Sequence, residues 1–297
     1  MMMRRWWTGS VVALAMVTLA VPRTRAGLVA YEPFDDTPGL PLLGSNGGIG
    51  FSQPWTPGGF NASIFANYAV APGSLPYPAP VTSGNRVTTG TQPAISGLSR
   101  TLATPLGTPG TTEYLSFLIR PEGTVGAGPL GGFFGLYLNA STIGPAVGQD
   151  LFLGKPGTSD RYAIENRGGA NQHVSAVTAT SGTTNLLVLR MDFTAGIDRF
   201  TLYVNPSPGA LEPSSGVVKQ DSDVGIVRAL TLYSTGAHSL DEIRIGTTYE
   251  DVVPVAVPEP ASLISGLIGL AALAARSCRR AGSDGGGRQG RAPESSP

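Results

Sequence analysis

Acidic residues, histidines and serines are the side chains that could do chemistry here, and their spacing forms no familiar catalytic set. Hydrolysis of a glycosidic bond by a retaining enzyme uses two carboxyl groups about 5 Å apart. On a strand this requires acids at alternate positions, because neighbouring side chains point to opposite faces. Asp241 and Glu242 are direct neighbours, so we expect them on opposite faces. The sequence therefore offers no two-carboxylate site, and a glycoside hydrolase is the weakest of the alternatives.

The other catalytic residue types are equally isolated. His173 and His238 have no ligand-like spacing to a second His, Cys or Glu, and we expect both at surface or edge positions. No Gly-x-Ser-x-Gly element marks a nucleophilic serine. We predict that the protein is not an enzyme and that it has no catalytic residues.

Four aromatic residues could instead bind a ligand, since exposed rings among Gly and Asn can stack on sugars. They lie in a Pro- and Gly-rich stretch at 47–80 and are Trp55, Phe60, Tyr68 and Tyr77. The alternative is that these rings pack back onto the core and close the ends of the fold. Both interpretations remain open from the sequence.

A calcium ion is the only cofactor for which the sequence offers candidate ligands. Asp35, Asp36 and Asp241 would converge if the first and last strands pair, and carboxylate oxygens are the ligands that Ca²⁺ prefers. Salt bridges and turn caps account for the same residues more simply. We therefore expect no cofactor and no metal site.

Short runs rich in Val, Ile, Thr, Phe and Tyr alternate with turn residues, and the whole chain contains 41 Gly and 25 Pro. This pattern is typical of many strands and little helix. Strands are predicted at 28–34, 85–88, 98–103, 113–120, 132–139, 150–154, 161–165, 186–193, 199–204, 228–233 and 240–245.

Alternation within these strands assigns one apolar face to each. The apolar sides contain Leu115, Phe117 and Ile119 in one strand, and Phe134, Leu136 and Leu138 in the next. Ile243 and Ile245 oppose Glu242 and Arg244 in the last strand. Two antiparallel sheets packed face to face would cover every such face, so we predict an all-β, two-sheet sandwich.

The segment 185–206 is the clearest hairpin. Leu187, Leu189, Met191 and Phe193 share one face, and after a turn at 194–198 the residues Phe200, Leu202 and Val204 share one face of the returning strand. We place Thr201 on the outward face.

Together with the YEPFDD segment at 31–36 and the DEIRIG segment at 241–246, this hairpin resembles the concanavalin A-like, laminin-G-like jelly rolls. The resemblance implies a jelly-roll sandwich over residues 27–254.

The N-terminal residues have the parts of a secretory signal peptide. Arg4 and Arg5 precede an apolar segment at 6–21, and a small residue, Ala26, follows at a suitable cleavage point. We predict a helical signal peptide at 1–26 that is cleaved after Ala26 by the secretion machinery.

The C-terminal residues 255–280 have three parts in order. The first part is a stiff element of Val257, Pro258, Glu259 and Pro260. An uncharged apolar run at 261–275 follows, and the third part is a basic cluster of Arg276, Arg279 and Arg280. Proline restricts the chain before it, so the apolar run starts afresh as a helix. At ~1.5 Å per residue the run covers roughly 22 Å, which crosses a bilayer only with its flanks.

This arrangement resembles the PEP-CTERM sorting signal, which directs exported bacterial proteins to a membrane protease called exosortase. The resemblance implies a membrane-anchored precursor, with exosortase as a partner and a destination at the cell surface or in the extracellular matrix. An ordinary single-pass transmembrane helix is the alternative. We expect residues 281–297 to form a disordered tail.

Charge and cysteine content limit the partners of the central region. Residues 27–254 contain 11 Lys and Arg against 17 Asp and Glu, a net charge of −6, and the only cysteine is Cys278. An acidic domain does not favour binding to nucleic acid, whose phosphates require a basic face. We predict a non-catalytic structural or interaction role outside the cell. The alternative is a carbohydrate-binding, lectin-like module on the same route, with extracellular polysaccharide as partner.

Overall fold

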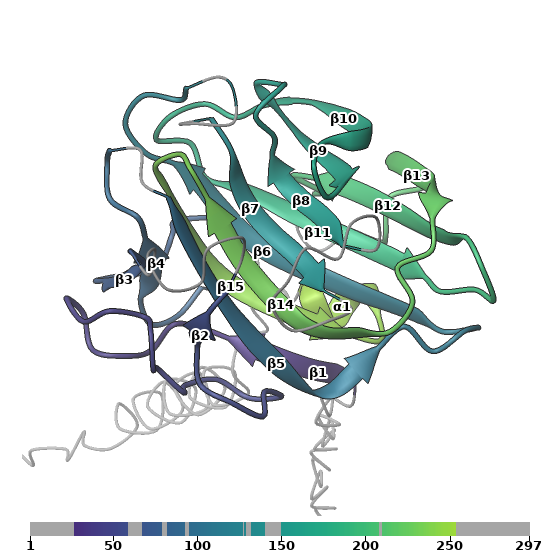
Figure 1. Ribbon diagram of the computed structural model, residues 1–297, viewed down its shortest axis with the longest axis horizontal. Coiled ribbons are helices and arrows are strands. Elements are labelled where there is room, and N and C mark those ends of the chain that lie inside the picture. Colours follow the sequence, from purple (N-terminus) through teal and green to yellow (C-terminus); the bar gives the residue numbers. More distant parts are fainter. Residues whose placement is uncertain are drawn as a thin grey trace, which may run out of the picture. The chain divides into compact units, whose positions relative to one another are not determined.

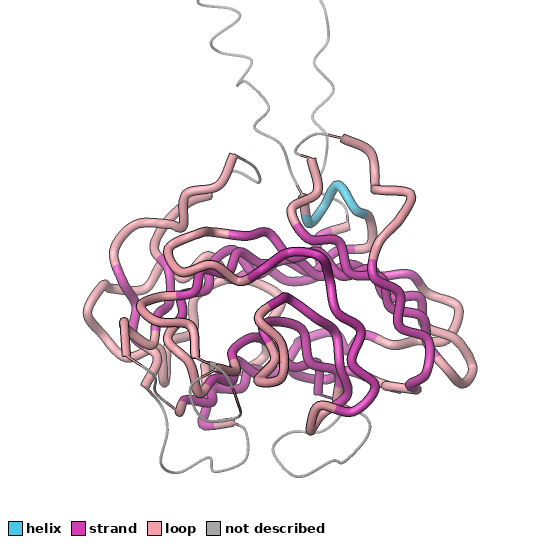
Figure 2. Tube along the Cα trace, turned by 90° about the horizontal axis from the view of Figure 1, so that it is seen from above, coloured by secondary structure: helices cyan, strands magenta, loops and turns pink. Residues whose placement is uncertain are grey.

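The protein forms fifteen strands and one short helix within the residues that the computed structural model describes. These are 27–58, 67–78, 82–92, 95–126, 128, 132–139, 150–207 and 210–253. The strands form two antiparallel sheets, which confirms the predicted all-β, two-sheet sandwich (Figure 1). Figure 2 shows the sheets as two layers of strands with loops at their ends.

The larger sheet contains eight strands. They are β1 Leu28–Glu32, β3 Ala69–Ala71, β4 Arg86–Thr88, β6 Thr112–Pro121, β11 Asn185–Asp192, β12 Asp198–Val204, β13 Val217–Ser222 and β15 His238–Gly246. Their order is β13-β12-β11-β6-β15-β4-β3, and β1 also pairs with β15. The first and last described strands therefore pair, which is the pairing that the calcium candidates require.

The smaller sheet contains seven strands. They are β2 Thr56–Pro57, β5 Ser96–Leu106, β7 Phe134–Asn139, β8 Leu151–Lys155, β9 Arg161–Asn166, β10 Ala170–Thr178 and β14 Val227–Ser234. Their order is β10-β9-β8-β7-β14-β5-β2. Neighbours that are distant in the sequence, such as β7 and β14, make the centre of this sheet.

The core lies between the two sheets and is built from the alternate positions that the sequence assigned to it. The predicted inward residues of β6, β7 and β15 belong to one buried cluster, as do those of the β11–β12 hairpin. Leu189 faces Leu202 across this hairpin, and Phe200 faces Met191. Burial of apolar surface contributes about 25 cal/mol per Å², which makes this layer the main source of stability.

All eleven predicted strands are present, and four further strands were missed. Two of these, β2 and β3, contain only two and three residues. The other two, β10 and β13, are edge strands whose side chains are largely exposed or half-buried. An edge strand with solvent on both sides needs no apolar alternation, so its sequence lacks the signal on which the prediction rests.

A buried ion pair joins the two sheets at one end of the core. Arg100 of β5 binds the carboxylate of Glu32 of β1, and both side chains are almost fully buried. Glu32 also accepts from the indole of Trp55 at 3.1 Å, while Arg100 donates to the Gly47 carbonyl at 2.5 Å. This cluster fixes the long connection between β1 and β2 against the sandwich.

A short helix, α1 Tyr249–Val252, follows β15 and was not predicted. Thr248 caps its first turn, and its apolar residues pack on the outer side of the larger sheet with Tyr114 and Leu118. The last described residues are therefore held on the fold by a second, smaller apolar cluster.

Several predictions concern residues outside the described part. The signal peptide at 1–26, the apolar run at 261–275 and the tail at 281–297 all lie there. Within the described residues, no helix has the length and apolar character that crossing a membrane requires.

Candidate functional site

Four aromatic rings gather on the outer face of the smaller sheet. Leu136 and Leu138 of β7 point into the core, so Tyr137 between them points outward. The same alternation turns Phe152 of β8 and Tyr233 of β14 to that face. Phe133, directly before β7, completes the group.

The rings contact one another in a fixed arrangement. Phe133 stacks on Phe152 with centroids 4.2 Å apart and an angle of 26°. Tyr233 meets Phe133 edge-on at 5.7 Å, and Tyr137 lies 5.2 Å from Phe152. Phe152 is fully buried beneath the group, whereas Phe133 and Tyr233 are half-buried. These two rings therefore keep part of their surface toward solvent.

Two glycines make room for the buried ring. Gly135 of β7 faces Gly154 of β8, and both flank the side chain of Phe152. A Cβ on Gly135 would lie 2.8 Å from the Phe152 ring and 2.3 Å from the Leu153 carbonyl oxygen. The absence of side chains at these two positions thus leaves room for the Phe152 ring.

A cavity of about 330 Å³ opens beside these rings. Its lining comes from β7, β9 and β14 and from the turns near them: Phe133, Tyr137, Gly157, Thr158, Glu165, Gly168, Gly169, Tyr233 and Thr235. We call it the aromatic pocket. Its volume is at the lower end of the range for small-ligand sites.

Glu165 is the one carboxylate among the lining residues that the structure describes. It points outward from β9, is 2% exposed, and accepts a hydrogen bond from Gln172 of β10 at 2.6 Å. Gln172 also donates to Thr158 at 2.8 Å. Burial raises the pKa of Glu165, and the bond from Gln172 opposes this shift. The pocket thus combines rings with a carboxylate that the Gln172 amide holds in place.

An ion pair lies next to the pocket. Arg167 binds Asp150 at 2.7 Å, and both side chains are buried or nearly so. Burial raises the pKa of the Tyr137 phenol, with smaller effects from Glu165 and from this pair. The phenol therefore stays protonated and can donate a hydrogen bond.

The aromatic residues that the sequence singled out do not meet here. Trp55 and Tyr68 are each 1% exposed and belong to the core, so neither offers a free ring. Tyr77 is half-buried and donates to Asn205 at 3.3 Å. Phe60 lies outside the described residues. A search of the outward positions of the predicted strands would have found Tyr137 and Tyr233.

The calcium candidates take part in different interactions. Asp241 is fully buried and accepts from the backbone amides of Leu75 and Glu242, each at 2.8 Å. Burial raises its pKa to about 8. Asp35 is exposed and Asp36 half-buried. The described residues contain no group of three or more His, Cys, Asp or Glu side chains that could hold a metal ion.

The expectation that Asp241 and Glu242 serve opposite faces is wrong. A bulge interrupts β15 at this point, and Glu242 has a φ of 54°. Glu242 accepts from the Ser83 amide at 2.7 Å, while Asp241 binds the amide of Leu75 in the same β3–β4 connection. Both carboxylates therefore hold one loop, because the bulge breaks the alternation. Arg244 binds Glu242 at 2.5 Å.

The two histidines lie in contrasting environments. His173 is half-exposed on β10, and its Nε2 lies 3.2 Å from a carboxylate oxygen of Asp221. The predicted surface or edge position is wrong for His238, which is fully buried and stacks on Phe134 at 5.1 Å. Burial lowers the pKa of His238 to about 4. All nine residues of β15 are buried, so the His238 ring lies inside the fold and not at its edge.

Comparison with known families identifies the C-terminal segment. The family model described as the PEP-CTERM protein-sorting motif matches residues 256–280. The resemblance noted in the sequence is confirmed, and the motif indicates an exported, membrane-anchored precursor that is sorted to the cell surface. No curated protein matches the sequence significantly.

Solved structures resemble the sandwich at low identity. The globular domain of T. cruzi calreticulin is 13% identical, with a TM-score of 0.46, and the alignment covers 76% of this chain and 90% of that one. An endo-1,3-beta-glucanase from Streptomyces sioyaensis is 11% identical, with a TM-score of 0.44, and the alignment covers 76% of this chain and 99% of that one. Peanut lectin is 10% identical, with a TM-score of 0.35, and the alignment covers 65% of this chain and 96% of that one. These similarities concern the fold alone.

Proposed function

We propose that the processed protein is a non-catalytic carbohydrate-binding component of the cell surface or extracellular matrix. In this proposal the aromatic pocket binds a sugar chain. The signal peptide and the sorting motif deliver the protein there through the secretion machinery and exosortase.

The observation that carries the proposal is the partly exposed pair Phe133 and Tyr233 above a buried aromatic layer. A pyranose ring has apolar C–H faces that pack on aromatic faces, and hydroxyl groups at its edge that need hydrogen-bond partners. Glu165 offers an acceptor and the Tyr137 phenol a donor beside those rings. Because the partners are already held in place, binding has little ordering entropy to overcome.

The absence of catalysis is part of the proposal. Acid–base hydrolysis of a glycosidic bond needs a second carboxyl group about 5 to 10 Å from the first. Among the described residues that line the pocket, Glu165 is alone in carrying a carboxylate. The nearby Asp150 is engaged with Arg167. We therefore expect binding without release of new reducing ends.

A glycan array with the exported protein tests the proposal. We expect saturable binding to at least one polysaccharide class, and incubation with that polysaccharide should leave its chain length unchanged. Binding to no polysaccharide would leave a purely structural role, which is the reading that the sequence alone favours. Shortening of the bound chains would show an enzyme instead.

A further inference from the structure

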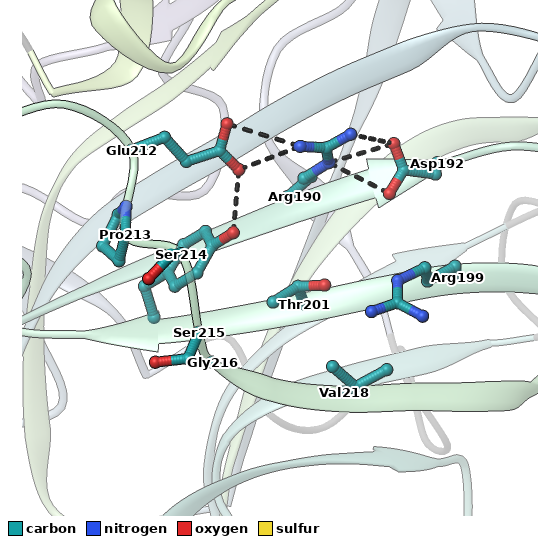
Figure 3. Close-up of a pocket in the computed structure, with 11 residues that line it drawn as sticks. Arg190, Asp192, Arg199, Thr201, Glu212, Pro213, Ser214, Ser215, Gly216 and Val218 are labelled. Carbon is teal, nitrogen blue, oxygen red and sulfur yellow. Dashed lines mark hydrogen bonds and ion pairs between the residues drawn. The ribbon is translucent and has the colours of Figure 1, made fainter.

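A second groove lies on the outer face of the other sheet. Its floor is formed by β11, β12 and β13, and its wall is the segment that leads into β13 (Figure 3). The cavity has a volume of about 710 Å³ and is lined by Arg190, Asp192, Arg199, Thr201, Tyr203, Glu212, Pro213, Ser214, Ser215, Gly216 and Val218. We call it the polar groove.

The wall of this groove is fixed by one acid. Glu212 accepts from the phenols of Tyr203 and Tyr114, at 2.8 and 2.9 Å, and from Arg190 at 3.2 Å. Arg190 in turn binds both carboxylate oxygens of Asp192 at 3.0 Å. The dashed lines in Figure 3 follow this network from the wall to the floor. The groove is therefore preorganised.

The same groove has polar groups that the network leaves available. Arg199 is exposed, and its guanidinium donates to the Gln220 side chain at 3.3 Å; it forms no ion pair within the described part of the chain. Ser214 and Ser215 are exposed on the wall, and their hydroxyls can both donate and accept. Donors and acceptors thus lie side by side around the cavity.

The charges of the groove balance. Arg190 and Arg199 are matched by Asp192 and Glu212, so the lining has no net formal charge. A balanced site has no long-range attraction for an ion, but its alternating donors and acceptors suit a neutral ligand that carries both. Neighbouring hydroxyl groups of a sugar chain have this chemistry.

We propose that the polar groove is a second binding site, for a neutral polysaccharide, and that the protein cross-links two polymer chains. The groove and the aromatic pocket lie on the outer faces of the two different sheets. About 10 Å of packed core separates the sheets, so the two sites open in opposite directions and hold separate chains. The cross-linking rests on the proposed function, whereas the groove itself is independent of the aromatic pocket.

Binding stoichiometry tests the second site. The exported protein is titrated calorimetrically with neutral hexaoses of β-1,3, β-1,4 and α-1,4 linkage, and with an oligogalacturonate of the same length. We expect two sites per chain for one neutral hexaose. Arg199→Ala and Ser214→Trp, both exposed changes, should weaken one site at least tenfold, and Tyr233→Ala should weaken the other. Arg228→Ala, an exposed arginine that lines neither cavity, is the matched control and should retain both.

The outcomes separate the two claims. One site that Tyr233→Ala removes would overturn the polar groove and leave the proposed function standing. If the titration shows a single site, and only Arg199→Ala and Ser214→Trp remove it, the groove is supported and the aromatic pocket is overturned. Binding of oligogalacturonate alone at the groove would overturn the neutral ligand class. No binding of any hexaose or of oligogalacturonate would overturn both sites.

Discussion

At the scale of single residues, the aromatic pocket depends on contacts among rings from separate parts of the chain, Phe133, Phe152 and Tyr233. Leu136 and Leu138 were assigned inward from the sequence, which left Tyr137 outward by default. Nothing local indicated that Phe133 and Tyr233, a hundred residues apart, would meet over Phe152. Their contact depends on the pairing of β7 with β14, a long-range feature that local periodicity does not specify.

The two faces of β11 and β12 should respond differently to truncation. Leu189 is fully buried in the core, so Leu189→Ala should lower the free energy of unfolding by about 2 to 5 kcal/mol. Thr201 is on the outward face, where it lines the polar groove, but it is only 6% exposed. Thr201→Ser, which keeps the hydroxyl, should cost less than about 1 kcal/mol. Urea denaturation measures both, and equal losses would mean that the register is shifted.

His238 should make the fold sensitive to acid. Its folded-state pKa of about 4 lies below the value of 6.5 for an unperturbed histidine, so protonation favours the unfolded chain. The penalty for protonating His238 in the folded state is absent above about pH 6.5 and grows as the pH falls toward 4. From the pKa difference it amounts to about 3 kcal/mol. The raised pKa of Asp241 acts in the opposite direction in the same window, so the test compares variants. His238→Gln should lower the slope of melting temperature against pH relative to the wild type, whereas the control His173→Gln should keep the wild-type slope. An unchanged slope in His238→Gln would contradict the assignment.

At the scale of elements, the sequence predicted the longer strands with one covered face and missed two very short strands and two largely polar edge strands. The eleven predicted strands each contain apolar residues that reach the core. The edge strand β10 is instead largely polar and partly exposed, yet its half-buried Gln172 holds the Glu165 carboxylate of the aromatic pocket. The bulge at Glu242 was equally invisible, since a positive φ at a non-glycine residue has no sequence signature here.

The ion pair between β1 and β5 should be costly to break from one side. Arg100→Ala would leave the Glu32 carboxylate buried without its charge partner, so we expect a loss of about 3 to 5 kcal/mol. The matched control is Arg161→Ala, since Arg161 is 51% exposed and lies 4.0 Å from Asp160. Exposed pairs of this kind contribute less than about 1 kcal/mol. Similar losses in the two variants would show that the buried pair does not join the sheets.

At the scale of the whole molecule, the described sandwich lies between the predicted signal peptide and the PEP-CTERM sorting motif. Gly27 accepts a hydrogen bond from Thr247 at 2.9 Å, so both ends of the described part lie side by side. Every described strand lies between residues 28 and 246. We therefore expect the described strand pairs to persist when residues 1–26 and the sorting motif at 256–280 are removed.

Processing should remove both terminal segments. If Val257 to Pro260 is recognised by exosortase, the mature protein should lack residues 1–26 and everything much beyond Pro260. Intact-mass spectrometry of the protein recovered from the cell surface measures this directly. A surface species that still contains residues 261–275 would contradict cleavage at this element.

The central claim is that the aromatic pocket binds a sugar chain, and the affinity of Tyr233→Ala for the best glycan of the array tests it most directly. Removal of one partly exposed ring should weaken binding by about 1 to 2 kcal/mol, or roughly 5- to 30-fold in Kd at the pocket. Tyr77→Ala, which removes a half-buried tyrosine that lines neither cavity, should leave Kd unchanged. Equal affinities for wild type and Tyr233→Ala, with both proteins folded, would contradict the claim.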